Sequence, residues 1–152
     1  MDFSFRIEGL DAITQASDRV KQAVADELNK AVYASAQKVS SEAKRSLLDG
    51  NKSGRIYKHG SVLHRASAPG EAPASDTGRL VNSINSYAVG NGEAISVAGR
   101  GTVKYAAMLE FGTIKIAPRP FMLPALEKSR AWIGERLNKA VRKAAIDSVQ
   151  KK

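Results

Sequence analysis

The feature that most constrains the fold is a long stripe of apolar side chains in the first third of the chain. Its members recur three or four residues apart, or at multiples of that spacing, and are Ile13, Val20, Val24, Leu28, Val32, Val39, Ala43 and Leu47. This period predicts one amphipathic helix with a continuous buried face. Asp11 can cap its start, and Asp49-Gly50 can end it. Such a helix is roughly 55 Å long at about 1.5 Å per residue. A compact single domain needs a shorter helix than this. The helix therefore either contains a break or packs against a partner subunit, and we expect a partner.

The composition supports one packed domain that spans residues 1–152. A chain of 152 residues, of which 43% are hydrophobic, can bury a core that needs no cross-links. It has no cysteine, which excludes disulfides and thiolate metal sites. No run of about 18 apolar residues occurs, and the N-terminus lacks the pattern of a secretory signal. We therefore expect no contact with a membrane, and a protein kept inside the producing cell or built into something assembled there.

Several short segments alternate apolar and polar residues, as half-buried β-strands do. The first contains Phe3, Phe5 and Ile7, and Gly9 ends it. Two more, at 84–90 and 93–99, flank Gly90-Asn91-Gly92. A three-residue loop at 90–92 pairs Tyr87 with Ile95 and Asn85 with Val97, and we favour it over a two-residue Asn91-Gly92 turn. The apolar residues that then share one face are Tyr87, Val89, Ile95 and Val97.

A second long helix is predicted at the C-terminal end. Its expected buried stripe contains Leu123, Leu126, Ile133, Leu137 and Val141. The small residues that would let a neighbour approach closely are Ala140, Ala144 and Ala145. Shorter helices are expected at 78–84 and 103–111. Together these elements predict an α+β fold, in which a small antiparallel β-sheet packs with a long N-terminal helix and a long C-terminal helix.

A long basic loop is expected at about 49–76. Gly, Ser, Pro and basic residues dominate it, and no periodicity is sustained. The chain carries a net charge of +9, yet residues 1–30 contain four basic and six acidic side chains, so the remainder carries +11. A positive excess of this kind suits an anionic partner such as the phosphates of DNA.

The basic loop allows two interpretations. In the first, four of its cations contact DNA phosphates without reading the base sequence, and these DNA-facing candidates are Lys52, Arg55, Lys58 and Arg65. In the second, the loop is solvated or docks onto an acidic neighbouring subunit. Tyr57 is the only aromatic residue among these cations, so stacking on bases contributes little in either case.

Three prolines stiffen the segment that leads into the last helix. Pro118, Pro120 and Pro124 fix three backbone angles within seven residues, and each pushes the residue before it toward an extended conformation. Pro124 falls in the first turn of the expected helix, where a missing N–H costs little. A connector this stiff is suited to hold two elements, or two subunits, at a fixed angle.

The sequence around this connector resembles a family of phage proteins. The family's motifs are a Tyr, then Glu-Phe-Gly-Thr, Pro-x-Pro-Phe and Pro-Ala-Leu, and they match Tyr105, Glu110-Phe111-Gly112-Thr113, Pro118-Arg119-Pro120-Phe121 and Pro124-Ala125-Leu126. A weaker upstream match includes Pro69-Gly70-Glu71-Ala72-Pro73, Thr77-Gly78-Arg79-Leu80 and Ser83-Ile84. On these motifs the chain is similar to the tail-completion or neck (head–tail joining) proteins of long-tailed phages, typified by the gene-ten product of lambdoid head–tail modules.

The resemblance implies a structural virion protein without catalysis, assembled in the host cytoplasm and located at the neck or tail. Such proteins form rings, commonly six-fold, around the DNA path and join the capsid connector to the tail tube. The implied partners are further copies of the chain, a head-closure or connector protein, a tail-tube or tail-terminator protein, and DNA phosphates without sequence specificity. The residues expected in the connector or at subunit contacts are Tyr105, Glu110, Phe111, Gly112, Pro118, Arg119, Pro120, Phe121, Leu123 and Pro124.

Two other functions stay open. One is a tail terminator that caps the tail tube, which the sequence does not separate from a neck protein. The other, from a different class, is a free basic DNA-binding protein, which would explain the charge and the long helices. No recognition-helix motif supports that second function, and it does not account for the proline connector.

Candidate catalytic and metal-binding residues are few. Glu110 lies between two apolar residues; it is either a catalytic acid or, as we favour, a carboxylate that binds Lys, Arg or the backbone N–H groups of the proline-rich loop. His59 and His64, with Asp49, Glu71 or Asp76, could ligate a metal, but solvated loop histidines are the favoured interpretation. No catalytic triad or phosphate-binding loop is recognisable. We therefore expect no catalytic residue, no cofactor site and no metal site.

Overall fold

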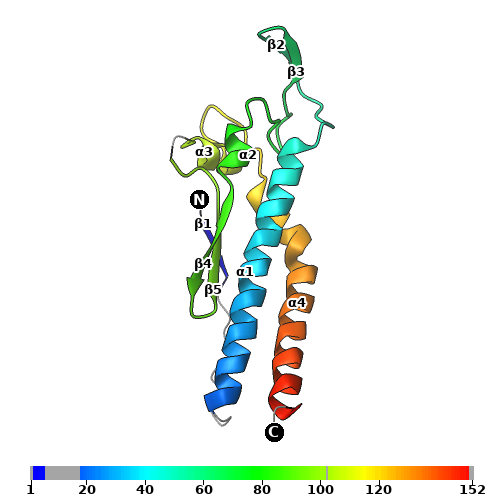
Figure 1. Cartoon of the computed structure of the whole chain (residues 1–152). Helices are drawn as coiled ribbons and strands as arrows, with labels where there is room; N and C mark the ends of the chain where they lie inside the picture. The colour runs from blue at the N-terminus through cyan, green and yellow to red at the C-terminus, as the bar shows by residue number, and fades with distance from the viewer. Residues whose placement is uncertain (1, 6–17, 102, 151–152) are drawn as a thin grey trace.

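Two long antiparallel helices and a small sheet form the body of the molecule (Figure 1). The computed structural model describes residues 2–5, 18–101 and 103–150. In chain order the elements are β1 (Asp2–Phe5), α1 (Asp18–Leu48), β2 (Ile56–His59), β3 (Val62–Arg65), α2 (Arg79–Asn82), β4 (Asn85–Gly90), β5 (Glu93–Val97), α3 (Ala106–Phe111) and α4 (Met122–Gln150). Helix α1 lies between the sheet and α4, which gives three layers (Figure 1). The predicted α+β architecture is confirmed. Among the helices described, none combines the length and the apolarity needed to cross a membrane.

Helix α1 is buried along the predicted stripe. Exposure is at most 5% at Val24, Leu28, Val32, Val39, Ala43 and Leu47. The expected cap at Asp11 and the stripe residue Ile13 lie outside the described residues. Much of the cover that we expected from a partner subunit comes from α4 of the same chain. Val24 and Leu28 pack with Ala140 and Ala144 of α4, so the stripe is explained within one subunit.

Helix α4 buries a face that differs from the predicted one at both ends. Ile133, Ala140 and Ala144 are buried as expected, and Leu126 and Leu137 pack partly buried against the core. Leu123 and Val141 are 47% and 43% exposed, so their assignment to the buried stripe is wrong. The core positions in the first turns are instead Met122, Ala125 and Ser129. Because Met122 enters the core and each residue turns a helix by about 100°, Leu123 is carried round to solvent.

The three-stranded sheet has the order β1-β5-β4 and is antiparallel throughout. Tyr87 pairs with Ile95 and Asn85 with Val97, as predicted. The turn is nevertheless the two-residue Asn91-Gly92 type, because Gly90 pairs with Glu93. Asn91 and Gly92 have φ angles of 51° and 78°, which suits a tight hairpin turn. A register shift between Ala88 and Gly90 inserts the extra residue that restores the pairing.

The face of the sheet that meets α1 carries small side chains. The Ser40 hydroxyl of α1 lies 2.7 Å from the Ser86 hydroxyl and 2.6 Å from the Ser96 hydroxyl. Ala94 packs against Val32 and Ala36. By contrast, Tyr87 is 39% exposed and Val89 is 56% exposed, and the Arg100 guanidinium lies 4.6 Å from the centre of the Tyr87 ring. Small residues on both partners let the helix approach the sheet closely, with the hydroxyl groups bonded to one another.

The segment expected as a long loop at about 49–76 contains a β-hairpin that the sequence did not predict. Strands β2 and β3 pair from Ile56↔Arg65 to His59↔Val62. The turn is Gly60-Ser61, and Gly60 has a φ of 62°, a conformation that glycine adopts without strain. The hairpin projects beyond the end of α1, away from the sheet (Figure 1). Its strands have four residues each and are exposed almost throughout, so no burial pattern marks them in the sequence.

Candidate assembly site

The side chain of Glu110 caps the start of α4. Its Oε2 atom accepts hydrogen bonds from the backbone N–H groups of Phe121, at 2.8 Å, and Met122, at 3.0 Å. Its Oε1 atom accepts one from the N–H of Leu123 at 2.8 Å. Glu110 is only 4% exposed, so these bonds are shielded from water. The interpretation of Glu110 as a carboxylate that binds the backbone of the proline-rich segment is confirmed.

Pro124 completes this cap. The first four N–H groups of an α-helix have no acceptor within the helix. Phe121, Met122 and Leu123 donate theirs to Glu110, and Pro124, the third residue of α4, has no N–H. The negative charge also lies at the positive end of the helix dipole. One carboxylate and one proline therefore satisfy the whole first turn, and they tie α3, which contains Glu110, to α4.

A tight reversal that requires glycine follows α3. Gly112 has a φ of 75°, and a Cβ atom there would lie 2.9 Å from the Ile116 carbonyl oxygen. The Thr113 N–H donates to that same carbonyl at 2.8 Å and closes a small loop. The Arg119 N–H then donates to the Leu109 carbonyl at 2.7 Å. This bond returns the chain to α3 immediately before the cap of α4.

The two sequence blocks that carry the family resemblance are in contact. The Gly70 N–H of the upstream block donates to the carbonyl of Pro118 at 2.9 Å. Ala72 packs against the main core cluster, which contains Phe121 and Met122. Close by, the Ser75 N–H donates to the Leu47 carbonyl at the end of α1, at 3.2 Å. Residues 68–75, which we call the strap, therefore hold the proline connector against the end of α1.

Glu71 is a structural residue that the sequence suggested only as a candidate metal ligand. Its carboxylate accepts hydrogen bonds from the Ser53 hydroxyl, from the Ser53 N–H at 3.1 Å and from the Ala68 N–H at 2.8 Å. These bonds, with that of the Ser53 hydroxyl the largest cause, lower the pKa of Glu71 to about 2. The carboxylate fastens the base of the hairpin to the strap. The sequence signal for this role is the position of Glu71 in a Pro-Gly-Glu-Ala-Pro run. Such a run predicts a turn, and a turn leaves backbone N–H groups that need an acceptor.

Five large apolar side chains on α3 and on either side of it in the chain are exposed to solvent. Ile114 is fully exposed, Phe111 is 71% exposed, and exposure is between 38% and 49% at Tyr105, Met108 and Ile116. We call these five residues the 105–116 surface. Single exposed apolar residues are normal, but a concentration of them marks an interaction surface.

The ten predicted connector residues therefore divide by environment. Contacts within the subunit engage Glu110, Gly112, Pro118, Phe121 and Pro124, and Phe121 is fully buried. Exposed to solvent are Tyr105, Phe111 and Leu123. Arg119 and Pro120 are half-buried, and the Arg119 Nε atom is buried without a hydrogen-bond partner among the described residues. The same segment thus contains both a rigid internal brace and an exposed face.

The four candidate DNA-facing cations also have different environments. The Lys52 ammonium donates to the Ser46 carbonyl at 2.8 Å and so caps the end of α1. Arg55, Lys58 and Arg65 are exposed on the hairpin. The strand register places Lys58 and Arg65 on one face of it. Only these three cations belong to the projecting hairpin.

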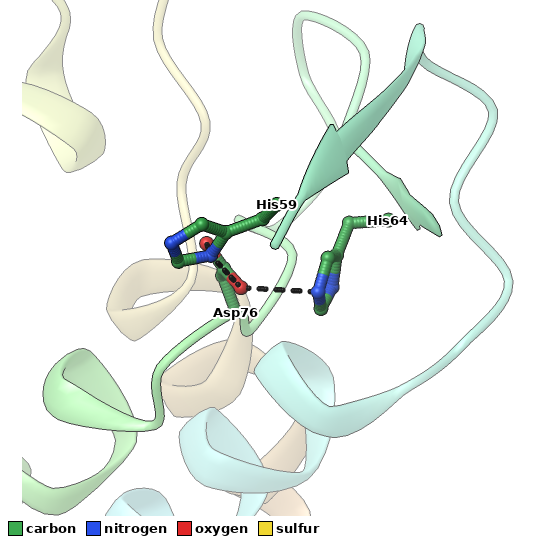
Figure 2. A group of neighbouring side chains, drawn as sticks. All are labelled: His59, His64 and Asp76. Carbon is green, nitrogen blue, oxygen red and sulfur yellow. Dashed lines mark hydrogen bonds and ion pairs between the residues drawn. The ribbon is translucent and has the colours of Figure 1, made fainter. Parts of the chain in front are cut away.

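Two histidines of the hairpin and one aspartate gather beside it (Figure 2). The Nδ1 atom of His59 lies 2.9 Å from one Asp76 carboxylate oxygen, and the Nε2 atom of His64 lies 3.4 Å from the other. The hydrogen bond with His59 is the main cause that lowers the pKa of Asp76. Of the three carboxylates considered from the sequence, Asp76 is the one that joins both histidines, and neither Asp49 nor Glu71 belongs to this group.

Comparison with known proteins identifies one family. A family model described as "Bacteriophage HK97-gp10, putative tail-component" matches residues 11–112. The match includes the strap, Tyr105, Glu110 and Phe111, and it ends before the proline connector and α4. No curated protein and no solved structure matches the chain.

Proposed function

This chain belongs to the HK97 gp10-like family of bacteriophage tail components, and on that premise we propose that it is a tail-completion protein of the head–tail junction. As a phage tail component it is a structural protein of the virion, and the family is not a class of enzymes. In the proposed arrangement, copies of the chain form a ring around the DNA path between the capsid connector and the tail tube. A six-fold ring is the symmetry we propose.

The observation that carries this proposal is the 105–116 surface. A closed ring needs a contact in which one surface of each subunit meets a different surface of the next. The 105–116 surface is apolar and exposed, and the Glu110 cap holds it firmly to α4. A rigid apolar surface loses little conformational entropy on binding, which favours assembly. We propose that Tyr105, Phe111 and Ile114 lie at the contact between subunits.

The hairpin supports a second part of the proposal. Arg55, Lys58 and Arg65 are exposed on an element that projects from the body (Figure 1). We propose that in the ring these three cations face the lumen and contact DNA phosphates, which needs no sequence specificity. Lys52 is less suited to this role, because its ammonium group already caps α1.

The test of the junction role uses a phage from which the gene for this chain is deleted. Electron microscopy of the lysate should show filled heads and tails that are not joined, and supplying the wild-type chain in trans should restore complete particles. Supplying Ile114→Asp should fail to restore them. The matched control is Ile146→Asp, which adds the same charge at an exposed isoleucine near the end of α4 and should restore joining.

Other outcomes of this experiment contradict the proposal. Complete particles without the gene would exclude an essential junction role. Tails of irregular length would instead indicate a tail terminator, since a protein that caps the tube controls where its growth stops. Normal joining with Ile114→Asp would exclude the 105–116 surface as the contact.

A further inference from the structure

We propose that His59, His64 and Asp76 form a binding site for one divalent transition-metal ion, with Zn²⁺ as the best match. The site would fasten the β2–β3 hairpin to the segment before α2. This inference goes beyond the proposed function and does not depend on it.

The hairpin brings the two imidazole rings together. Tyr57 pairs with His64 and His59 pairs with Val62, so the two histidines are diagonal neighbours on one face. Such neighbours are about 7–8 Å apart at the backbone, within reach of long side chains. The ring centres are 6.0 Å apart. The Tyr57 ring stacks on the ring of His64 at a centre-to-centre distance of 5.9 Å, which helps to orient it.

Asp76 reaches this pair from another part of the chain. Figure 2 shows its carboxylate between the two rings, with His59 on one side and His64 on the other. One nitrogen of each histidine and one oxygen of Asp76 all lie within 4.8 Å of one another. Three potential ligand atoms from two segments of the chain therefore converge on one point.

The distances agree with a tetrahedral metal ion. Zinc bonds to His and Asp of about 2.0–2.2 Å place neighbouring ligand atoms roughly 3.3 Å apart. The same Asp76 oxygen, Oδ1, lies 3.1 Å from His59 Nδ1 and 3.4 Å from His64 Nε2. One nitrogen of each ring and one Asp76 oxygen lie within 4.8 Å of one another, and movement of these side chains would bring all three to bonding distance of one ion. The fourth position is open to water, because the His59 side chain is 59% exposed.

The ligand set selects the class of ion. Two imidazole nitrogens with one carboxylate suit Zn²⁺ and its neighbours among the transition metals, whereas Mg²⁺ and Ca²⁺ prefer oxygen ligands alone. Two of the three hairpin cations do not oppose a metal ion directly. Side chains alternate between the faces of a strand, so Lys58 and Arg65 lie on the face opposite to His59 and His64.

A metal ion would hold the hairpin more firmly than the contacts of Asp76 with the two histidines do. Exposed ion pairs contribute little to stability, and the contacts of Asp76 with both histidines are of this kind. A metal ion bound by all three residues would hold the hairpin, which contains Arg55, Lys58 and Arg65, in one orientation relative to the body.

The test is a titration of the untagged full-length chain with Zn²⁺, followed by ¹H NMR. The chain contains two histidines, so every imidazole signal belongs to the proposed site. One equivalent of Zn²⁺ should shift both signals together, EDTA should reverse the shift, and Mg²⁺ at the same concentrations should shift neither. Asp76→Asn should weaken Zn²⁺ binding at least about tenfold. Loss of a residue that only hydrogen-bonds to a metal ligand already weakens metal binding by about this factor, and Asp76 would be a ligand itself.

The matched control is Asp49→Asn, which removes the same charge from an exposed carboxylate outside the group and should bind Zn²⁺ like the wild type. Circular dichroism of both variants shows whether the helices are retained. The proposal is overturned if Zn²⁺ shifts neither signal or only one of them. It is also overturned if Asp76→Asn binds as tightly as the wild type, or if Mg²⁺ produces the same shifts.

Discussion

Single carboxylates hold the irregular segments of this molecule in place. Glu110 binds three backbone N–H groups at the start of α4, and Glu71 binds the hairpin base to the strap. Each carboxylate can accept several hydrogen bonds at once, and bonds to a charged acceptor are stronger than neutral ones. This chemistry lets two side chains organise segments that have no regular backbone pairing.

Among the residues whose burial the structure describes, Phe121 is the largest fully buried side chain, and Phe121→Ala should lower the free energy of unfolding. Its neighbours in the core cluster include Leu47, Ile84 and Met122. Deletion of a buried phenylalanine ring typically costs about 3–5 kcal/mol. Urea unfolding measures this loss. The control is Leu123→Ala, at a side chain that is 47% exposed, for which we expect less than about 1 kcal/mol. Equal losses in both variants would contradict the core position of Phe121.

Glu71 should make the fold sensitive to acid. Its pKa in the folded protein is about 2, below the ordinary value of 4.5. The folded state therefore binds the Glu71 proton less readily than the unfolded chain does. Its stabilising contribution is complete above about pH 4.5 and is lost as the pH falls toward about 2.

Glu71→Gln should accordingly reduce the drop in melting temperature between about pH 5 and about pH 3. Calorimetry at several pH values measures that drop. The control is Glu135→Gln, which removes a carboxylate from the outside of α4 and leaves the contacts of Glu71 intact. The same pH dependence in the Glu71 variant and the wild type would show that Glu71 does not anchor the strap.

Two elements of this fold depend on contacts outside their own backbone. Helix α4 takes its cap from α3, and the hairpin is fastened at its base by Glu71 of the strap. The position of each is therefore set by a side chain that lies outside the element itself. Substitution of such a side chain should therefore destabilise the element that it fastens.

Glu110→Ala should loosen the first turn of α4. The N–H groups of Phe121 and Met122 belong to fully buried residues, and each would be left without an acceptor. One buried donor without a partner costs about 1–3 kcal/mol, so we expect a loss of at least about 2 kcal/mol. Amide hydrogen exchange at residues 121–123 should become faster. Glu110→Gln keeps one acceptor oxygen, so its stability and its exchange rates should lie between those of the wild type and those of Glu110→Ala. Unchanged exchange at these amides would exclude Glu110 as the cap.

The hairpin should govern the salt dependence of binding to duplex DNA. Neutralising Arg55 and Lys58 together, as Arg55→Gln and Lys58→Gln, should reduce the slope of log K against log salt by about 1.8, or roughly 0.9 for each lost phosphate contact. The control makes Lys139→Gln and Arg142→Gln on the exposed side of α4, with the same change in net charge. Equal slopes in both double variants would show that the hairpin has no special contact with DNA.

The whole molecule combines a rigid three-layer body with an exposed apolar surface at α3 and a projecting hairpin at the end of α1 (Figure 1). Helix α1 is the central layer, covered by the sheet on one side and by α4 on the other. The hairpin and the exposed apolar surface both adjoin the end of the body where α1 ends and α4 begins. The strap connects these parts. Assembly contacts and DNA contacts would therefore be made from one well-fixed region.

Ile114→Asp should prevent self-association without unfolding the chain. Ile114 is fully exposed, so a carboxylate there costs the monomer little, but at a subunit contact it would be buried without a partner. Native mass spectrometry should show discrete rings for the wild type and monomers for the variant, with equal melting temperatures. Ile146→Asp should form rings like the wild type. A wild-type chain that stays monomeric at every concentration would argue against the ring.

The sequence by itself determined the features that depend on local pattern. The 3.6-residue period predicts the buried stripe of α1, the pairing of β4 with β5 follows from alternation, and Pro124 marks the first turn of α4. The motifs between Tyr105 and Leu126, supported by the upstream block, gave the family resemblance, and the match over residues 11–112 confirms the family. These properties can be predicted from the sequence because each depends on residues that are neighbours in the chain.

Only the tertiary structure decided which surfaces meet. Helix α1 has a second buried face of small residues, including Ala36 and Ser40, and such residues carry no strong hydrophobic signal before their partners are known. The exposure of Leu123 depends on how α4 is rotated once Met122 is buried. The meeting of Asp76 with His59 and His64 depends on the register of an exposed hairpin. In each case the deciding contact joins residues that are distant in sequence, because packing and hydrogen-bond geometry, rather than local periodicity, select it.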